Sequence, residues 1–313
     1  MKRIELPIEY KGNAKAIDML NRILARDELA HAYLFQGPAG VGKFQVGLAL
    51  ARSLLNTEKD VHPDLLILER QGSNIRIAEV RRLKEWAINK PYLASRKVAL
   101  IPEAHLLSNE GANALLKILE EPAGDLVLIL TADLETLPPT VVSRCQVIRF
   151  QALSAEEVRE ILRAKGVESK KAAQLSLLCG GSPGRALSMA DADLWAAIDL
   201  ALLLLEDIGQ GNTLACYEMA ENLEKDEGQR NALLSILEVL IRDSLLYARG
   251  ITDQMQLLPE EKAARMASVG ADGLARMIRS IGKARRDLTR NASPLLVQVK
   301  LYLELADSLK EVV

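Results

Sequence analysis

Residues 37–43 read Gly37-Pro38-Ala39-Gly40-Val41-Gly42-Lys43, and this stretch decides the fold class of the 313-residue chain. Its spacing matches the phosphate-binding loop pattern G-x-x-x-x-G-K, which normally continues with Ser or Thr. In this chain the next residue is Phe44. The Ser or Thr hydroxyl ligates the Mg²⁺ that bridges nucleotide phosphates, and a phenyl ring cannot do so. The sequence therefore predicts a degenerate nucleotide site built from Gly37, Gly40, Gly42 and Lys43, with Phe44 at the lost metal position.

The segments on either side of this loop have the types that a phosphate-binding loop requires. Residues 32–36 form a short apolar run that favours a strand, and residues 44–55 continue as an Ala- and Leu-rich helical pattern. Backbone N–H groups at the start of that helix would point at a phosphate. An ordinary tight turn between a strand and a helix is the alternative interpretation.

Further apolar runs predict a parallel sheet. They lie at 65–68, 97–101, 126–131 and 147–150, and helical patterns separate them. Continuous apolar runs of this kind are typical of strands that are buried on both faces of an α/β sheet. The phosphate-binding loop would then lie at the carboxyl end of its strand, where ligands bind in such sheets.

The strand signal ends at Phe150, and the rest of the chain is helical in pattern. Ser154 predicts a helix N-cap because Glu157 follows three residues later, which is the spacing of a capping box. Glycines between 180 and 184 punctuate a small helical unit that ends near residue 190. We therefore expect an α/β domain at 1–152, a small helical domain at 153–190 and a larger all-α domain at 191–313.

Composition narrows the class of protein. The chain has 40 Lys and Arg against 42 Asp and Glu, which argues against a protein covered by nucleic acid but not against a local basic strip. Its three cysteines lack the paired C-x-x-C spacing of a zinc site. The longest apolar stretch, 194–205, is too short to span a bilayer. We expect a cytoplasmic protein without zinc, disulfides or a membrane partner.

The strand at 97–101 ends in a second departure from an active ATPase. In ATPases with a phosphate-binding loop, such a strand ends in an Asp that holds Mg²⁺, often followed by a Glu that activates water. Here Pro102 takes the Asp position and Glu103 follows it. With both metal-ligand positions lost, we expect no hydrolysis by this chain. Taken alone, the segment also fits an ordinary buried strand that ends in a turn.

Several segments resemble the clamp-loader subunits of bacterial DNA polymerase III, and together they cover essentially the whole chain. The resemblance rests on the following segments: His31-Ala32-Tyr33-Leu34-Phe35, His62-Pro63-Asp64-Leu65, residues 113–122 (NALLKILEEP), Ser143-Arg144-Cys145 and Asn291-Ala292-Ser293-Pro294-Leu295. They are most similar to the delta-prime subunits, AAA+ proteins that lie beside the gamma and tau ATPase subunits. The resemblance implies that the three expected domains are an AAA+ P-loop domain, a helical lid and an all-α collar used for oligomerisation.

The resemblance also implies a role and a set of partners. A delta-prime-like subunit resembles a stator that requires no cofactor and hydrolyses no ATP, although ATP or ADP can bind without turnover. The implied partners are the gamma/tau and delta subunits, the sliding clamp and primer–template DNA, in a nucleoid-associated replisome. The alternative is an active gamma/tau-like motor with unusual metal ligands, which Phe44 and Pro102 argue against. Residues 55–61 stand where many relatives carry a four-cysteine zinc module, so zinc is expected to be absent.

Three polar residues receive roles from the resemblance. The arginine of the SRC motif reaches a neighbouring subunit's nucleotide site, so Arg144 is expected to act as an arginine finger in trans and to stabilise charge on the transferred phosphoryl group. Thr131 matches the sensor-1 position, and Arg185 matches the sensor-2 position. The alternatives are a local ion pair for Arg144, a strand-end core residue for Thr131 and a solvent-facing helix start for Arg185.

Contact with DNA is expected from the first domain. Residues 76–84 form a basic segment that includes Arg76 and Arg82, and Ser108 opens a helix that carries Asn113. Relatives hold DNA phosphates with helix N-termini and basic side chains, so these four residues are the DNA-binding candidates. A solvated helix face is the alternative.

Overall fold

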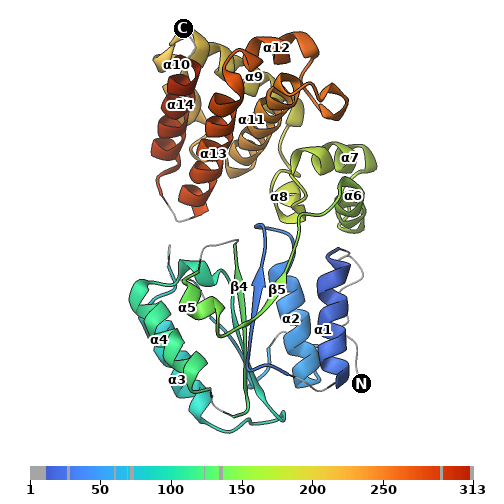
Figure 1. The fold of residues 1–313 in the computed structure, drawn as a ribbon, viewed down its shortest axis with the longest axis vertical. Helices are drawn as coiled ribbons and strands as arrows, with labels where there is room; N and C mark the ends of the chain where they lie inside the picture. Colours follow the sequence, from blue (N-terminus) through green and yellow to red (C-terminus); the bar gives the residue numbers. More distant parts are fainter. Residues whose placement is uncertain are drawn as a thin grey trace. The chain divides into compact units, whose positions relative to one another are not determined.

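The computed structural model describes residues 12–26, 29–59, 61–68, 70, 74–122, 124–133, 137–289 and 292–310. Asn291 of the collar-like motif and the outermost residues of the first and third expected domains lie outside this set. The described residues form two compact units (Figure 1). One unit runs to Ala172 and includes Gly180–Gly184, and the other contains Ala173–Cys179 and the chain from Arg185 onward. The three-domain division at 152 and 190 stays a prediction.

The first unit is built on a five-stranded sheet in the order β2-β3-β4-β1-β5, and every pairing in it is parallel. The strands are β1 (Ala32–Gln36), β2 (Leu65–Ile67), β3 (Lys97–Ile101), β4 (Leu126–Ala132) and β5 (Gln146–Arg149). Each lies on an apolar run that the sequence marked as a strand. The α/β prediction is confirmed.

Helices cover both faces of this sheet. They are α1 (Ala14–Arg26), α2 (Lys43–Leu55), α3 (Ile77–Ile88), α4 (Asn109–Glu120) and α5 (Pro139–Val142), with a 3₁₀ turn η1 (Ala104–Leu106). Figure 1 shows α1 and α2 on one face and α3, α4 and α5 on the other. The three central strands β3, β4 and β1 are buried along their whole length, and this burial on both faces explains why their sequences are mostly apolar at successive positions rather than at alternate ones.

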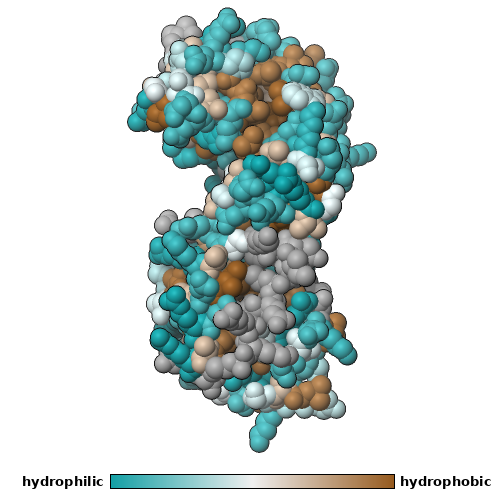
Figure 2. Space-filling model, turned by 90° about the vertical axis from the view of Figure 1, so that its right-hand side faces the viewer, coloured by the Kyte–Doolittle hydropathy of each residue, from teal (hydrophilic) through white to brown (hydrophobic). Residues whose placement is uncertain are grey.

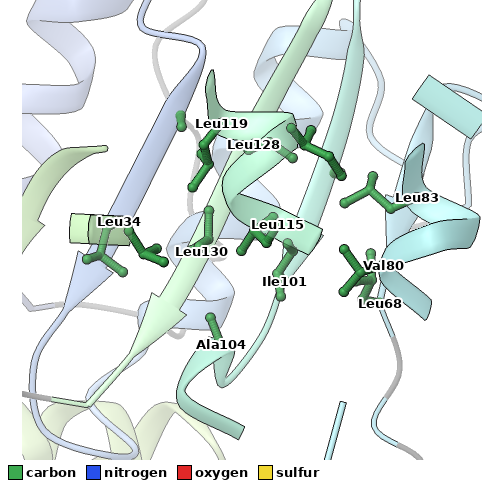
Figure 3. Close-up of a cluster of buried hydrophobic side chains, with 14 of the residues drawn as sticks. Leu34, Leu68, Val80, Leu83, Ile101, Ala104, Leu115, Leu119, Leu128 and Leu130 are labelled. Carbon is green, nitrogen blue, oxygen red and sulfur yellow. The ribbon is translucent and has the colours of Figure 1, made fainter. Parts of the chain in front are cut away.

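The core on the α3 and α4 side takes every second residue of the strands. Leu34, Ile101, Leu128 and Leu130 point from the sheet toward this layer (Figure 3). They meet side chains from the two helices and from the loops beside them: Val80, Leu83, Leu115, Leu119, Leu68 and Ala104. A residue in this cluster is at most 9% exposed, so the layer fixes α4 firmly against the sheet.

The opposite face receives α2, the helix that begins at the phosphate-binding loop. Gly47 is the point of closest approach, because a Cβ there would lie 3.0 Å from Leu100 and 3.4 Å from Ile129. A methyl group at this position would require the neighbouring side chains to shift by a few tenths of an ångström. The first unit thus holds the loop between β1 and a tightly seated helix.

Helix α6 (Ala155–Ala164) also belongs to the first unit, and its start was predicted from sequence. The Ser154 hydroxyl accepts the backbone N–H of Glu157, and the Glu157 carboxylate accepts the backbone N–H of Ser154 at 2.8 Å. This reciprocal pair is the capping box that the spacing indicated, and the prediction is confirmed.

The second unit is all-α within the described residues. Its main helices are α9 (Leu194–Gln210), α10 (Thr213–Asn222), α11 (Glu227–Ala248), α12 (Glu260–Ala267), α13 (Gly270–Thr289) and α14 (Pro294–Lys310), with η2 (Thr252–Gln254) between α11 and α12. Two shorter helices, α7 (Ser169–Leu178) and α8 (Pro183–Ser188), contribute residues to both units. Helix α11 is central, since it packs against α9, α12 and α13.

The surface of the second unit is not uniformly hydrophilic. Figure 2 shows a brown, apolar area among teal residues on its upper part. Large apolar side chains that remain exposed on α9, α10 and α14 are Trp195, Leu203, Leu214, Tyr217, Leu296 and Leu303. Across the residues described, none of the helices combines the length and the apolar character that crossing a membrane requires.

Candidate nucleotide-related site

The phosphate-binding loop joins β1 to α2 and needs glycine for two different reasons. Gly40 has φ 72° and Gly42, the N-cap of α2, has φ 95°, a left-handed backbone that only glycine adopts without strain. At Gly37 the reason is space, because a Cβ there would overlap the carbonyl oxygen of Phe150. The three glycines therefore fit the loop conformation whether or not a nucleotide binds.

The Lys43 ammonium is turned into its own loop. Its Nζ donates to the carbonyl oxygens of Gly37 at 2.6 Å and Pro38 at 2.7 Å, and to Asp133 Oδ1 at 3.2 Å. The side chain is 9% exposed. Burial lowers the pKa of Lys43, while the charge and hydrogen bond of Asp133 and the charge of Glu103 oppose that fall. The amine is thus an ion-paired, nearly enclosed group.

The positions that would hold Mg²⁺ carry no metal-binding group. Phe44 is half-buried in the first turn of α2, and a phenyl ring offers no ligand atom. Pro102 follows β3 at the carboxyl end of the sheet, where an Asp would be needed. In the part of the chain that the structure describes, no group of three or more His, Cys, Asp or Glu side chains could hold a metal ion. Phe44 and Pro102 thus offer no ligand atom to a magnesium–nucleotide complex.

Glu103 and Thr131 come together at the ends of β3 and β4. The hydroxyl of Thr131, which is buried, accepts the backbone N–H of Glu103 at 3.0 Å. Glu103 has φ 48°, an uncommon backbone conformation for a residue other than glycine, and its carboxylate lies 3.6 Å from Arg70. The bond from Thr131 therefore holds the turn that carries Glu103.

Asp133 also belongs to this site, although the sequence did not predict it as a site residue. It lies directly after β4, two residues beyond Thr131, and its backbone N–H donates to His105 Nδ1 at 3.4 Å. A neutral imidazole that accepts at Nδ1 carries its proton on Nε2, and Nε2 lies 3.8 Å from Asp133 Oδ2. The structure therefore brings together Lys43, Asp133 and His105, with Glu103 close enough to act on the lysine charge.

Arg144 lies elsewhere on the first unit, just after α5. Its Nη2 is 2.7 Å from Glu120 Oε1, and its Nη1 donates to the carbonyl oxygen of Thr140 at 2.9 Å. The arginine side chain is 36% exposed, so part of it remains open to solvent. Cys145 of the same motif packs against the core, and burial raises the pKa of its thiol to about 11. The cysteine is thus a packing residue, whereas the arginine faces outward.

Arg185 belongs to the second unit, where it joins a cluster on α11. Its Nη1 lies 3.3 Å from Glu238 Oε2, and Arg285 Nη2 lies 3.4 Å from the same oxygen. Burial and the neighbouring Arg185 charge lower the pKa of Arg285 to about 10, against the opposing pull of Glu238. The proposed contact of Arg185 with a nucleotide stays a prediction.

Two of the DNA-binding candidates lie side by side at the starts of α3 and α4. Arg76 precedes α3 and Ser108 is the N-cap of α4. Two backbone hydrogen bonds join the two helix starts. The N–H of Ile75 donates to the carbonyl oxygen of Leu106, and the N–H of Ser108 donates to the carbonyl oxygen of Ile75. Arg82 and Asn113 are exposed farther along the helices, and Arg82 lies 3.8 Å from Glu79. The geometry is that of two adjacent helix N-termini with a basic side chain beside them.

Sequence comparisons relate this chain to replication proteins. A family model described as DNA polymerase III, delta subunit, matches residues 12–154. The chain is 30% identical to a DNA polymerase III subunit delta' of Bacillus subtilis, over 52% of this chain and 54% of that protein. It is 35% identical to a subunit delta' of Pseudomonas aeruginosa, over 50% of this chain and 55% of the relative.

A match to a different subunit is longer. The chain is 29% identical to the DNA polymerase III subunit tau of Escherichia coli, over 90% of this chain and 44% of that protein. The chain spans about half the length of the curated relatives it matches. Both kinds of subunit are thus similar to it, and the similarity to tau extends into the all-α unit.

Proposed function

We propose that this chain, a member of the clamp-loader subunit family of DNA polymerase III, is a delta-prime-like subunit. In this proposal the chain itself hydrolyses no ATP. It supplies Arg144 to the nucleotide site of a neighbouring gamma/tau subunit while the sliding clamp is loaded onto primed DNA. The observation that carries the proposal is the pairing of a disabled metal site with an outward-facing arginine.

The disabled site is the first support. Phosphoryl transfer needs Mg²⁺ to bridge the phosphates and to neutralise developing charge. Phe44 and Pro102 stand at the two positions that would hold the ion, and Lys43 already binds Asp133. Glu103 is left as a base with no ordered metal–phosphate complex beside it. Such a site is suited to holding the fold of the loop rather than to chemistry.

The second support is the presentation of Arg144. A guanidinium offers five N–H donors in a planar fork, which suits bidentate contact with phosphate oxygens. Here one edge of the fork is oriented by Glu120 and Thr140, on α4 and α5. The remaining donors extend from a side chain that is partly exposed on the first unit. An arginine held in this way is pre-organised for a phosphate that another subunit brings.

The proposed partners follow from the same family and from two surfaces. The gamma/tau and delta subunits are proposed to meet the second unit, which exposes apolar side chains on α9, α10 and α14 beside a cavity of about 280 Å³. Primer–template DNA is proposed to contact the paired helix starts at Arg76 and Ser108, because helix N-termini favour phosphate. We propose that the chain acts in the cytoplasm, at the replisome.

The test is ATP turnover in a clamp loader reconstituted from this chain with its gamma/tau and delta partners. Arg144→Ala is expected to lower DNA-stimulated turnover by at least tenfold, since an arginine finger contributes about 10³–10⁵ in rate. Arg149→Ala is the matched control, because it removes an exposed arginine from the same unit at a position that receives no role in this proposal. Normal turnover with Arg144→Ala, or an equal loss with Arg149→Ala, would contradict the finger role.

The second candidate function is an active gamma/tau-like motor, favoured by the long match to tau. It requires steady Mg²⁺-dependent ATP turnover by the isolated chain, abolished by Lys43→Ala. The proposal expects no turnover above that of the Lys43→Ala variant. A single assay on purified chain therefore separates the two candidates.

A further inference from the structure

The contacts of Lys43 show an amine whose donors are already used. An ammonium has three N–H donors, and in this chain three oxygens accept them: those of Gly37, Pro38 and Asp133. Two of these oxygens belong to the loop itself, and the third comes from the end of β4. A phosphate that approached the loop would have to replace one of them. The Asp133 contact is the longest of the three and the only one of them from outside the loop.

The sheet itself fixes Asp133 in this position. Strands β1 and β4 are parallel neighbours, and Gln36 is in register with Ala132. The next residues, Gly37 and Asp133, therefore leave the sheet together, and the N–H of Gly37 donates to the carbonyl oxygen of Ala132 at 3.3 Å. His105 also contacts Asp133, since its Nδ1 accepts the backbone N–H and its Nε2 lies 3.8 Å from Oδ2. The sheet thus places the backbone of Asp133, and the carboxylate reaches both Lys43 and His105 from there.

Two carboxylates near Lys43 reduce the attraction that the lysine charge would exert on an anion. Asp133 pairs directly with the ammonium, and the Glu103 carboxylate also acts on its charge. The Glu103 carboxylate also lies 3.6 Å from Arg70 Nη1. Because the lysine is almost enclosed, its ion pair is screened by water less than a surface pair would be.

We propose that Asp133 takes the place of a nucleotide phosphate toward Lys43, so that the chain keeps its phosphate-binding loop closed without a ligand. Residues of the chain alone then pair the buried amine, stabilise the loop conformation and hold α2 against the sheet. Nucleotide binding would require that the carboxylate be displaced. The inference rests on the proposed function only in treating this loop as a degenerate nucleotide site, and it names Asp133 as the group that weakens nucleotide affinity.

The test is binding of fluorescently labelled ADP to the isolated full-length chain, measured by fluorescence anisotropy with and without Mg²⁺. Asp133→Asn keeps the size of the side chain and removes its charge, and it is expected to bind at least fivefold more tightly than the unmodified chain. Glu85→Gln removes one exposed carboxylate from α3 and is expected to leave affinity unchanged. Asp133→Ser serves as the second variant, and a thermal melt of each protein establishes that it is folded.

A double variant distinguishes a specific Asp133–Lys43 ion pair from general repulsion between the Asp133 charge and the nucleotide. In a Lys43→Ala background, removal of the Asp133 charge is expected to give no gain in affinity. Equal affinities for Asp133→Asn and the unmodified chain, no binding by either, or a gain that persists without Lys43 would each overturn the inference. The assay uses no partner subunit, so a failed Arg144 experiment would overturn the proposed function and leave this result as it stands.

Discussion

The guanidinium of Arg144 and the carboxylate of Glu120 are joined at 2.7 Å, from Nη2 to Oε1, across the ends of two helices. Both side chains are well exposed, at 36% and 49%, so their ion pair contributes under about 1 kcal/mol to stability. Its main effect is geometric. It fixes one edge of the guanidinium while Thr140 fixes a second N–H.

We expect Arg144→Lys to resemble Arg144→Ala in the reconstituted clamp loader. A lysine keeps the charge but lacks the planar fork that binds two phosphate oxygens at once. DNA-stimulated turnover should fall by about tenfold or more in both variants. Arg149→Lys, an exposed arginine on the neighbouring strand β5, is the matched control and should behave as the unmodified chain. Full activity of Arg144→Lys would show that charge alone is sufficient.

The Asp64 carboxylate is expected to be a major contributor to the stability of the first unit. It is fully buried and accepts the backbone N–H groups of Tyr92, Leu93 and Ala94 at 2.6–2.9 Å. Asp64→Ala leaves these donors unsatisfied and should lower the free energy of unfolding by about 2–4 kcal/mol. Urea denaturation measures the free energy of unfolding, and Asp18→Asn, at an exposed position, is the control. A change below about 0.5 kcal/mol for Asp64→Ala would contradict the expectation.

The same residue gives a pH dependence with a defined sign. Burial raises the pKa of Asp64, but the three backbone hydrogen bonds and the His62 charge outweigh burial, so its pKa is lowered overall. A group with a lowered folded-state pKa stabilises above its unfolded value, about 3.9 for Asp, and loses that contribution as the pH falls through the folded value. The stability difference between the unmodified chain and Asp64→Asn should therefore be constant above about pH 4 and shrink below it.

The capping box of α6 yields a local prediction. Ser154→Ala removes the acceptor for the Glu157 N–H and should destabilise the helix by about 1 kcal/mol. Hydrogen exchange of residues 155–164, followed by mass spectrometry, reports on this helix rather than on the whole chain. Ser154→Thr keeps a hydroxyl and should retain most of the protection. Equal protection in the Ala and Thr variants would show that the cap is not significant here.

Gly37→Ala should destabilise the first unit although it adds a single methyl group. That methyl would overlap the carbonyl oxygen of Phe150, which is backbone and cannot move aside cheaply. Overpacking of this kind costs about 1–3 kcal/mol. Gly124→Ala is the matched control because nothing lies within 4 Å of a Cβ built there. Comparable unfolding midpoints for the two variants would contradict the close approach between β1 and Phe150.

The sequence predicted most of the first unit because its signals are local. Continuous apolar runs gave all five strands to within one or two residues at each end, and the spacing of Ser154 and Glu157 gave the start of α6. The glycines at 40 and 42 were predicted from a motif and adopt the left-handed backbone that the motif uses. Each of these features depends on neighbours within a few residues.

The partners of Lys43 and Arg144 could not be predicted in this way. Asp133 is 90 residues from Lys43 in the chain, and the two meet because β1 and β4 pair in one particular register. Glu120 lies within the segment 113–122 that supported the resemblance, but no periodicity indicates that the end of α4 faces the residue after α5. Such contacts follow from tertiary packing, which a single sequence does not display.

Helix α4 has Ser108 at its first end and Glu120 at its last. A helix of this length is about 18 Å long. Its buried side packs against the sheet through Leu115 and Leu119. A rigid shift of α4 would therefore move Ser108 and Glu120 together, and with Glu120 the ion pair to Arg144. The residue proposed to contact DNA and the partner of the proposed arginine finger thus belong to one helix.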